Sequence, residues 1–137
     1  MPASTEEPLE LRDTPCTVCP WRRDADMTRF GRHDIAMLAR AHGEPGAEAP
    51  RTAPMISCHC DQPGTPHAMR LCAGWLAAEG RQHFGVRIHQ LAGTLPETAC
   101  SPGPGWPELV ADFAELVTRW RRAHAQLRPR DEEMPHV

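Results

Sequence analysis

The stretch CTVCPWRRD, from Cys16 to Asp24, constrains the fold of this chain more than any other. Two cysteines three positions apart form a C-x2-C turn, in which both sulfurs can point at one ion. Pro20 follows directly and stiffens the exit of the turn, because its ring fixes a backbone dihedral. The pair is therefore half of a metal site, a redox pair, or half of a disulfide framework.

The rest of the chain favours reduced cysteines. The first residues, MPASTEEPLEL, lack a basic segment followed by an apolar one, so we expect no secretory signal. No apolar run approaches the length of a membrane span, and we expect no membrane partner. We therefore expect a cytoplasmic protein. Patterned cysteines there bind metals or act in catalysis more often than they form disulfides.

The composition indicates a small body that needs support beyond its hydrophobic core. The 137 residues fit one domain, and the polar ends, residues 1–14 and 130–137, are predicted to be disordered tails. Residues 15–129 form the expected metal-binding helical domain. Apolar residues make up only 40% of the chain, which also has 15 prolines and 10 glycines. A domain this rich in loops gains from a bound metal or a similar cross-link.

Helical spacing of apolar residues predicts three short helices, over residues 35–42, 71–80 and 84–91. Asp34 is expected to be the N-cap of the first helix. Glycine is common at or just past a helix C-terminus. Glycines stand at the three expected ends: Gly43, Gly80 and Gly93.

The last predicted helix has the clearest pattern. Pro107 is expected at its first position, where the missing N–H costs nothing. Apolar residues then line one face from Leu109 to Leu127, and Pro129 is expected to end the helix. Only MISCHC, residues 55–60, could form a short strand or a second cysteine turn. We therefore predict a mainly α fold, a small irregular helical domain nucleated on a four-cysteine metal site, with little or no β-structure.

A tetrahedral metal site needs two ligands in addition to the C-x2-C pair. The candidates lie between residues 58 and 72, in the CHC stretch and beyond it. The preferred metal ligands are Cys16, Cys19, Cys58 and Cys72, and the secondary candidates are His59 and Cys60. Neighbouring side chains in CHC cannot all reach one ion, so we expect at most one or two of them to bind.

The residues beside these cysteines fit a metal site. Ala73 and Gly74 are small and let the backbone approach a bound sulfur, while Trp21 and Trp75 are available to exclude water. Zinc and a 4Fe–4S cluster both accept four thiolates. We expect zinc, because nothing else in the sequence indicates electron transfer. A structural zinc contributes about 10–16 kcal/mol to folding.

Three other interpretations of the cysteines stay open. Reduced cysteines can simply pack in the core, where cysteine is common. A thioredoxin-like redox pair needs a βαβ setting, and no strand pattern precedes Cys16. A thiol-active enzyme needs a cysteine with a histidine partner. The only support for this in the sequence is that Cys58 and His59 are adjacent. No catalytic residue is predicted.

Three separated motifs occur in order over about residues 15–93. They are CxxCPWR (Cys16 to Arg22), CH (Cys58 and His59) and CAGW (Cys72 to Trp75). These motifs resemble those of domain of unknown function family 6283, small proteins of actinobacteria and their phages. The resemblance supports the four-cysteine set and implies that His59 is a ligand or supports one. It implies no activity.

The chain departs from that family at one place. Family members often carry another Cys-His pair just after CAGW, where this chain has Ala77, Ala78 and Glu79. Cys60 and Cys100 lie outside the shared pattern, so the resemblance does not make them essential ligands.

We expect a protein partner, and a nucleic acid stays an open alternative that the charges do not support. A net charge of −3 leaves no basic footprint for DNA or RNA. We expect Arg22 and Arg23 to bond local carbonyls or acids such as Asp24. The predicted function is a small cytosolic zinc-binding module, a non-enzymatic regulatory or interaction protein. The alternatives are an iron–sulfur protein with a redox or oxygen-sensing role and, less favoured, a thiol-active enzyme.

Overall fold

The computed structural model describes residues 8–58, 60 and 70–133. Within these ranges the chain forms four α-helices and three short 3-10 helices, joined by long irregular segments. No β-sheet forms in the described ranges, where extended segments meet only at isolated bridges. The predicted mainly α fold with little β-structure is therefore confirmed.

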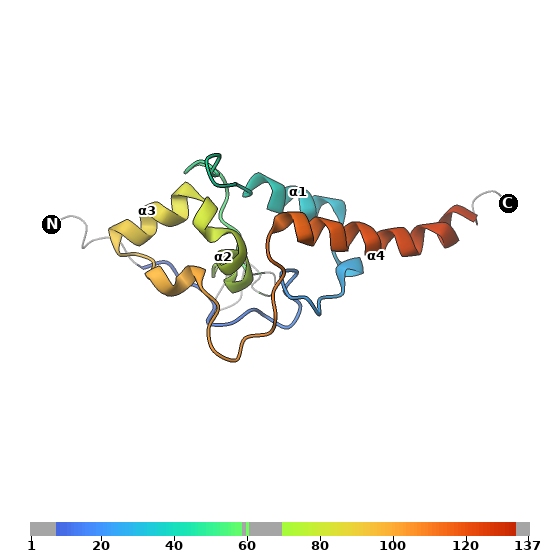
Figure 1. Cartoon of the computed structure of the whole chain (residues 1–137), viewed down its shortest axis with the longest axis horizontal. Helices are drawn as coiled ribbons and strands as arrows, with labels where there is room; N and C mark the ends of the chain where they lie inside the picture. The colour runs from blue at the N-terminus through green and yellow to red at the C-terminus, as the bar shows by residue number, and fades with distance from the viewer. Residues whose placement is uncertain (1–7, 59, 61–69, 134–137) are drawn as a thin grey trace.

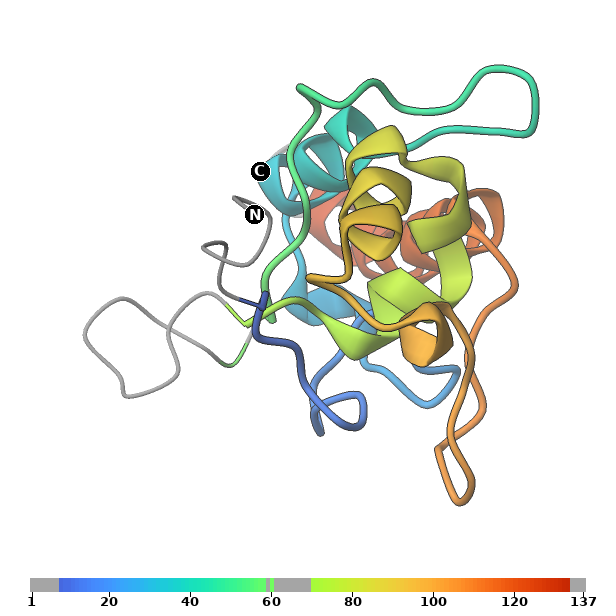
Figure 2. The same cartoon turned by 90° about the vertical axis from the view of Figure 1, so that its left-hand side faces the viewer.

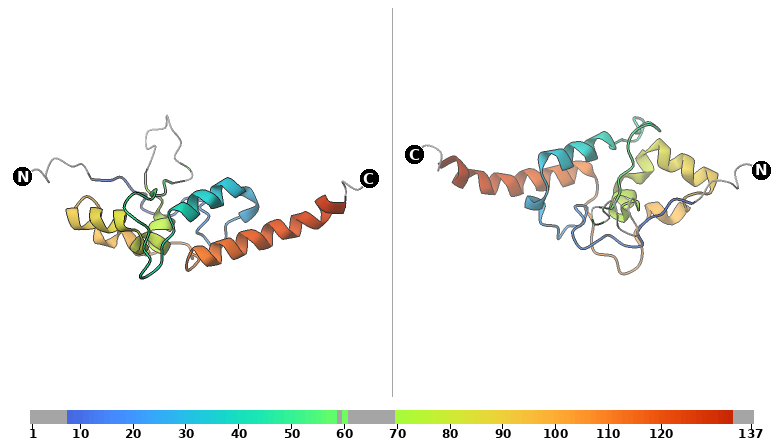
Figure 3. Two further views of the ribbon diagram at one scale, coloured as in Figure 1. Left: turned by 90° about the horizontal axis from the view of Figure 1, so that it is seen from above. Right: turned by 180° about the vertical axis from the view of Figure 1, so that it is seen from behind.

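The helices form two groups. α1 (Arg32–Arg40) lies beside the first part of α4 (Phe113–Glu133), and α4 continues well beyond it (Figures 1 and 3). α2 (Ala73–Glu79) and α3 (Phe84–Ala92) occupy the other end of the molecule. Seen from that end in Figure 2, they lie in front together with η4 (Glu97–Cys100).

α2 and α3 begin at side chains that cap them. Cys72 precedes α2, and its Sγ accepts a hydrogen bond from the Trp75 N–H at 3.4 Å. His83 precedes α3, and its Nδ1 accepts one from the Gly85 N–H at 2.9 Å. Gly93 ends α3 in the left-handed conformation, at a φ of 82°. The predicted helices over residues 71–80 and 84–91 are confirmed, with slightly shorter or shifted bounds.

The apolar positions that predict α3 do not face the core. Phe84 and Ile88 are 44% and 43% exposed, and Leu91 is 89% exposed. Val86 is instead fully buried. The helical period is right, but α3 packs through a different edge, so periodicity alone identifies the element and not its buried face.

α1 begins three residues before the predicted start. Gly31 is its N-cap, and the carboxylate of Asp34 accepts a hydrogen bond from the Gly31 N–H at 2.8 Å. Asp34 was expected to be the N-cap itself, and that prediction is wrong. Asp34 lies in the first turn of α1, and its carboxylate pairs with the backbone N–H of the N-cap residue. Leu38 is the buried residue of this helix.

The bounds of α4 correct two further predictions. The helix begins at Phe113 rather than Pro107, and it continues past Pro129. A proline removes one hydrogen bond within a helix, and α4 persists without that bond. Asp112 caps the actual start, because its Oδ1 accepts a hydrogen bond from the Glu115 N–H at 2.9 Å.

The segment before α4 is extended because it pairs with the cysteine turn. Leu109 forms an antiparallel bridge with Arg22, and the Val110 N–H donates to the Trp21 carbonyl at 2.9 Å. These bonds between residues far apart in sequence outweigh the local preference of the segment for helix. They also fix the C-x2-C turn against the C-terminal third of the chain.

The cysteines are part of the hydrophobic core. The largest fully buried side chains are Trp21, Trp75, Leu76, Leu95, Leu116, His83, Val86 and Cys19. Cys16, Cys58 and Cys72 are 3–4% exposed and belong to the same cluster. No helix in the described part of the chain is long and apolar enough to cross a membrane.

Part of the predicted N-terminal tail contacts the body. The Leu9 N–H donates to the Thr94 carbonyl at 2.9 Å, and the Leu71 N–H donates to the Glu10 carbonyl at 2.9 Å. The Arg12 N–H donates in turn to the Leu71 carbonyl at 3.1 Å. Residues 1–7 and 134–137 lie outside the described ranges, and the disorder of the tails stays a prediction.

Candidate metal centre

The C-x2-C turn is built by backbone hydrogen bonds. The Cys19 N–H donates to the Cys16 carbonyl at 3.1 Å, and the Arg22 N–H donates to the Cys19 carbonyl at 3.2 Å. The backbone N–H groups of Trp21 and Arg22 lower the pKa of Cys19, after the larger effects of Cys72 and burial. N–H donors of this kind stabilise thiolates.

Cys58 and Cys72 lie on two short extended segments that pair with each other. Residues 56–58 run antiparallel to residues 70–72, with the Ser57–Leu71 bridge between them. The Cys58 N–H donates to the Arg70 carbonyl at 2.7 Å, and the Cys72 N–H donates to the Ile56 carbonyl at 2.9 Å. The sequence leaves residues 55–60 open to a short strand or a second cysteine turn, and their described part forms one isolated bridge.

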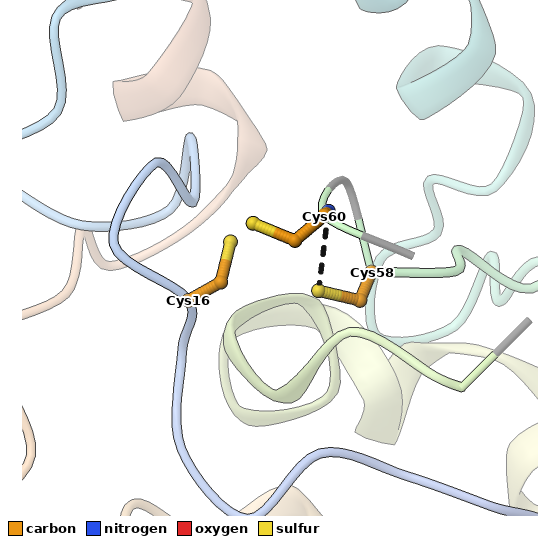
Figure 4. A group of neighbouring side chains, drawn as sticks. All are labelled: Cys16, Cys58 and Cys60. Atoms are coloured by element: carbon orange, nitrogen blue, oxygen red, sulfur yellow. Dashed lines mark hydrogen bonds between the residues drawn. The ribbon is translucent and has the colours of Figure 1, made fainter. Parts of the chain in front are cut away.

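The structure places the sulfurs in two groups. The Sγ atoms of Cys16, Cys58 and Cys60 all lie within 4.8 Å of one another, and this group could hold a metal ion (Figure 4). The Sγ atoms of Cys19 and Cys72 are 3.8 Å apart. Cys60 is exposed, whereas the other four cysteines are buried.

Burial and the neighbouring thiols shift the pKa values of the buried cysteines in both groups. Burial raises the pKa of Cys16, and the neighbouring Cys60 and Cys19 add to this rise. Burial also raises the pKa of Cys58, to which Cys16 contributes. The hydrogen bond with Cys72 lowers the pKa of Cys19, and the same bond raises the pKa of Cys72 well above its usual value. A metal ion would take the place of the protons that these thiols hold.

Gly74 allows the first turn of α2 to approach the cysteine turn. A Cβ atom at this position would lie 2.7 Å from the Cys19 Sγ and 2.8 Å from the Trp21 Cβ. Real carbon contacts are about 3.5–4.0 Å. The small residues after Cys72 therefore do allow close approach, and the sulfur they approach is that of Cys19.

One pair of sulfurs has the spacing of a tetrahedral thiolate site. Four thiolates at about 2.3 Å from one zinc ion stand about 3.8 Å apart. Cys19 and Cys72 already have this spacing. The sulfurs of Cys16, Cys58 and Cys60 lie within 4.8 Å of one another, a distance within which neither Cys19 nor Cys72 joins them. The donors present therefore fit a soft metal.

Arg22 makes local contacts, as predicted, whereas Arg23 pairs with an acid far away in the sequence. Arg22 holds Asp24 through two hydrogen bonds of 2.8 Å and donates to the Cys16 carbonyl at 3.3 Å. Arg23 forms an ion pair with Glu115 on α4. The positive charge of Arg22 also lowers the pKa of Cys19, after the larger effects of Cys72, burial and the Trp21 N–H.

Two of the remaining candidates are placed as follows. Cys100 is buried in η4, where its Sγ accepts a hydrogen bond from the Gln90 Nε2 at 3.7 Å, and it belongs to neither sulfur group. His59 lies outside the described residues, so its role as ligand or supporting group stays a prediction.

Sequence analysis does not single out a buried carboxylate on α2 that contacts the start of α4 and the segment after α1. Glu79 is 4% exposed and accepts hydrogen bonds from the His42 Nδ1 at 2.7 Å and from the Phe113 N–H at 2.9 Å. Burial opposes the charged form of His42, but Glu79 and Glu44 outweigh it and raise the pKa of His42. The only signal in the sequence is an acid at the end of the apolar stretch LAAEG.

Comparison with known proteins gives one match. The model of a family described as "Family of unknown function (DUF6283)" matches residues 11–131. The chain belongs to this family. No curated protein and no solved structure matches the chain. The matched range extends beyond the three cysteine motifs on both sides, so it includes α4 and its contacts with the cysteine turn.

Proposed function

We propose that this chain is a small zinc-binding interaction module. Its zinc ion would be held by the thiolates of Cys16, Cys19, Cys58 and Cys72. The observation that carries this proposal is the 3.8 Å separation of the Cys19 and Cys72 sulfurs, contributed by two segments far apart in sequence. Two thiolate ligands of one zinc ion stand at about this separation.

The exposure of the sulfurs favours Cys58 over Cys60 as the fourth ligand. Cys58 is 3% exposed and is fixed by its backbone bond to Arg70. Cys60 is exposed, and its N–H donates to the Cys58 Sγ at 3.4 Å. Such a bond stabilises a thiolate that binds metal. Cys60 would thus support Cys58 through its backbone.

Nearby positive charge also favours the four-thiolate site. A zinc ion with four thiolates is net negative, and it needs compensation inside a core. Arg22 lies close enough to Cys19 and Cys16 for its own pKa to rise, chiefly through Asp24 and then through these sulfurs. Burial raises the pKa of Cys58, and the positive charge of Arg12 opposes this larger effect by lowering it.

The same spacing favours a single ion over an iron–sulfur cluster. A 4Fe–4S cluster fills the space between its four ligand sulfurs, so those sulfurs stand farther apart than around one ion. Cys19 and Cys72, at 3.8 Å, leave no room for a cluster between them. Zinc supplies no redox chemistry, and its role here would be to stabilise the fold.

A groove between α1 and α4 supports the interaction part of the proposal. It has a volume of about 760 Å³ and an apolar floor that includes Ile35, Trp120 and Leu127. Its charged lining groups are Arg32 and Arg121, and none of its described lining residues is acidic. The groove fits an amphipathic helix with acidic residues beside its apolar face. The acidic residues of such a partner would complement the positive charges that line the groove, although the net charge of the whole chain is negative.

Metal analysis of anaerobically purified protein tests the zinc site. We expect about one zinc per chain, as a single four-ligand site requires. Cys16→Ser and Cys72→Ser should lose the metal and unfold. The matched control, Cys100→Ser, changes a buried cysteine outside both groups and should keep the metal. A metal-free protein that stays folded after both ligand changes would refute the proposal. A brown protein that absorbs near about 400 nm would favour the cluster instead.

Peptide binding tests the groove. A fluorescent helical peptide of leucine and glutamate should bind more tightly than the same pattern built with lysine, as measured by anisotropy. Arg121→Glu should weaken the binding. Arg87→Glu, on α3 and half-exposed, is the control and should leave it unchanged. Equal binding of the two peptides would show that the charge of the groove does not select a partner.

A further inference from the structure

One thiol of the candidate centre is left without a ligand role. A tetrahedral site uses four thiolates, yet five cysteines gather here. Cys60 is the fifth, and it is exposed while the other four are buried. Its sulfur lies within 4.8 Å of those of Cys16 and Cys58. An accessible thiol beside a buried group of thiols is where an oxidant from solution would react first.

We propose that Cys60 is an oxidation site that forms a disulfide with Cys16 when the protein meets a hydroperoxide. In Figure 4 the sulfurs of Cys16 and Cys60 point toward one another. A disulfide needs a sulfur separation of about 2.05 Å, which rotation of the exposed Cys60 side chain can approach from the present distance. The release of zinc described below rests on the proposed zinc site, whereas the disulfide itself does not.

Cys58 is the less suitable partner for Cys60. One residue separates the two, so their disulfide would close a small ring in the backbone. The Cys58 Sγ also accepts a hydrogen bond from the Cys60 N–H at 3.4 Å, and it does not point toward the Cys60 Sγ (Figure 4). Cys16 comes from a different segment, so its disulfide with Cys60 would close no small ring, and the two sulfurs lie within 4.8 Å of each other.

The reaction uses one hydroperoxide and two sulfurs. The Cys60 sulfur takes the outer oxygen of the hydroperoxide, the O–O bond breaks, and an alcohol (water, for hydrogen peroxide) leaves. This gives a sulfenic acid on Cys60. The Cys16 thiolate then attacks the Cys60 sulfur, the S–O bond breaks, and the oxygen leaves as water after taking up one proton. The two sulfurs lose two electrons, and the peroxide gains them.

The disulfide would remove one zinc ligand. A zinc ion that loses the Cys16 thiolate keeps three ligands and is held more weakly. Because the centre lies in the core, its loss would loosen the contacts around Trp21 and the start of α2. Thiol reductants would restore Cys16 and with it the metal site. The module would thus release its metal in response to peroxide.

Peptide mapping and zinc release test the inference on the full-length zinc-bound protein. After treatment with hydrogen peroxide, we expect a Cys16–Cys60 linked peptide pair under non-reducing conditions and zinc captured by a coloured chelator. Cys60→Ser should lose both the linked pair and the fast phase of zinc release. Cys100→Ser should behave as the wild type. Circular dichroism of each variant before oxidation checks that the fold is intact.

Two results would overturn the inference. One is a disulfide that joins other cysteines, and the other is zinc release from Cys60→Ser as fast as from the wild type. If the reduced protein holds no zinc, the proposed zinc site fails, and peptide mapping of the metal-free chain still decides whether Cys16 and Cys60 join. The two proposals therefore fail separately.

Discussion

Replacing Gly74 with alanine tests the close contact between α2 and the cysteine turn. In an exposed helix, Gly→Ala stabilises by about 1 kcal/mol through helix propensity. Here the new Cβ would lie 2.7 Å from the Cys19 Sγ and 2.8 Å from the Trp21 Cβ. Both atoms would have to move by about 1 Å to restore a normal contact. Overpacking of this size costs about 1–3 kcal/mol.

The structure therefore predicts that Gly74→Ala is destabilising by up to about 2 kcal/mol despite its better propensity. Moving the Cys19 sulfur also disturbs its 3.8 Å spacing to Cys72. We expect zinc affinity to fall about 10- to 100-fold, as it does when groups beside metal ligands are changed. Urea unfolding, with zinc and with chelator, gives the first quantity, and competition with a coloured chelator gives the second.

Ala77→Gly is the matched control on the same helix. Ala77 is only half-buried, so this change reports propensity alone and should cost about 1 kcal/mol without altering zinc affinity. If Gly74→Ala instead stabilised the protein and bound zinc as the wild type does, the contact with Cys19 would not constrain the site.

Three further predictions concern contacts that hold the cysteine turn and the helices together. Glu79 and Glu44 raise the pKa of His42 against the effect of burial, so the charged His42 stabilises the fold at low pH. This stability is complete below about pH 6.5 and is lost as the pH rises through the higher folded pKa. Glu79→Gln should flatten that fall in unfolding free energy, measured by urea titrations at several pH values; an unchanged slope would contradict the assignment. Trp120→Phe removes the hydrogen bond from the Trp120 Nε1 to the Phe30 carbonyl, at 2.8 Å. Because that carbonyl keeps its hydrogen bond with the His124 Nε2 at 3.0 Å, the change should cost about 0.5–1.5 kcal/mol in the same assay. Glu115→Gln weakens the part-exposed ion pair with Arg23 and should cost at most about 1 kcal/mol, an effect that shrinks in high salt.

The sequence predicts well those features that depend on neighbours in the chain. α2 and α3 follow from short-range spacing and from Gly80 and Gly93, which stand at their ends. The C-x2-C turn follows from local geometry in the same way. These features involve few residues, and local preference is enough to specify them. The need for a small residue at position 74 arises instead from Cys19 and Trp21, which lie far away in sequence.

The features that sequence analysis mistakes depend on long-range pairing. The helix predicted from Pro107 does not form there, because Leu109 and Val110 pair with the cysteine turn instead. Which face of α3 is exposed depends on how the rest of the chain packs against this helix. No local pattern in the sequence predicts that the Cys60 sulfur lies within 4.8 Å of the Cys16 sulfur.

The zinc site itself depends on one arrangement of atoms, four sulfurs around one ion. X-ray absorption at the zinc edge of the purified protein measures that arrangement directly. We predict a shell of four sulfurs at about 2.3 Å and no nitrogen or oxygen ligand. A shell with nitrogen or oxygen, or protein that binds no zinc when the metal is supplied, would contradict the four-thiolate site.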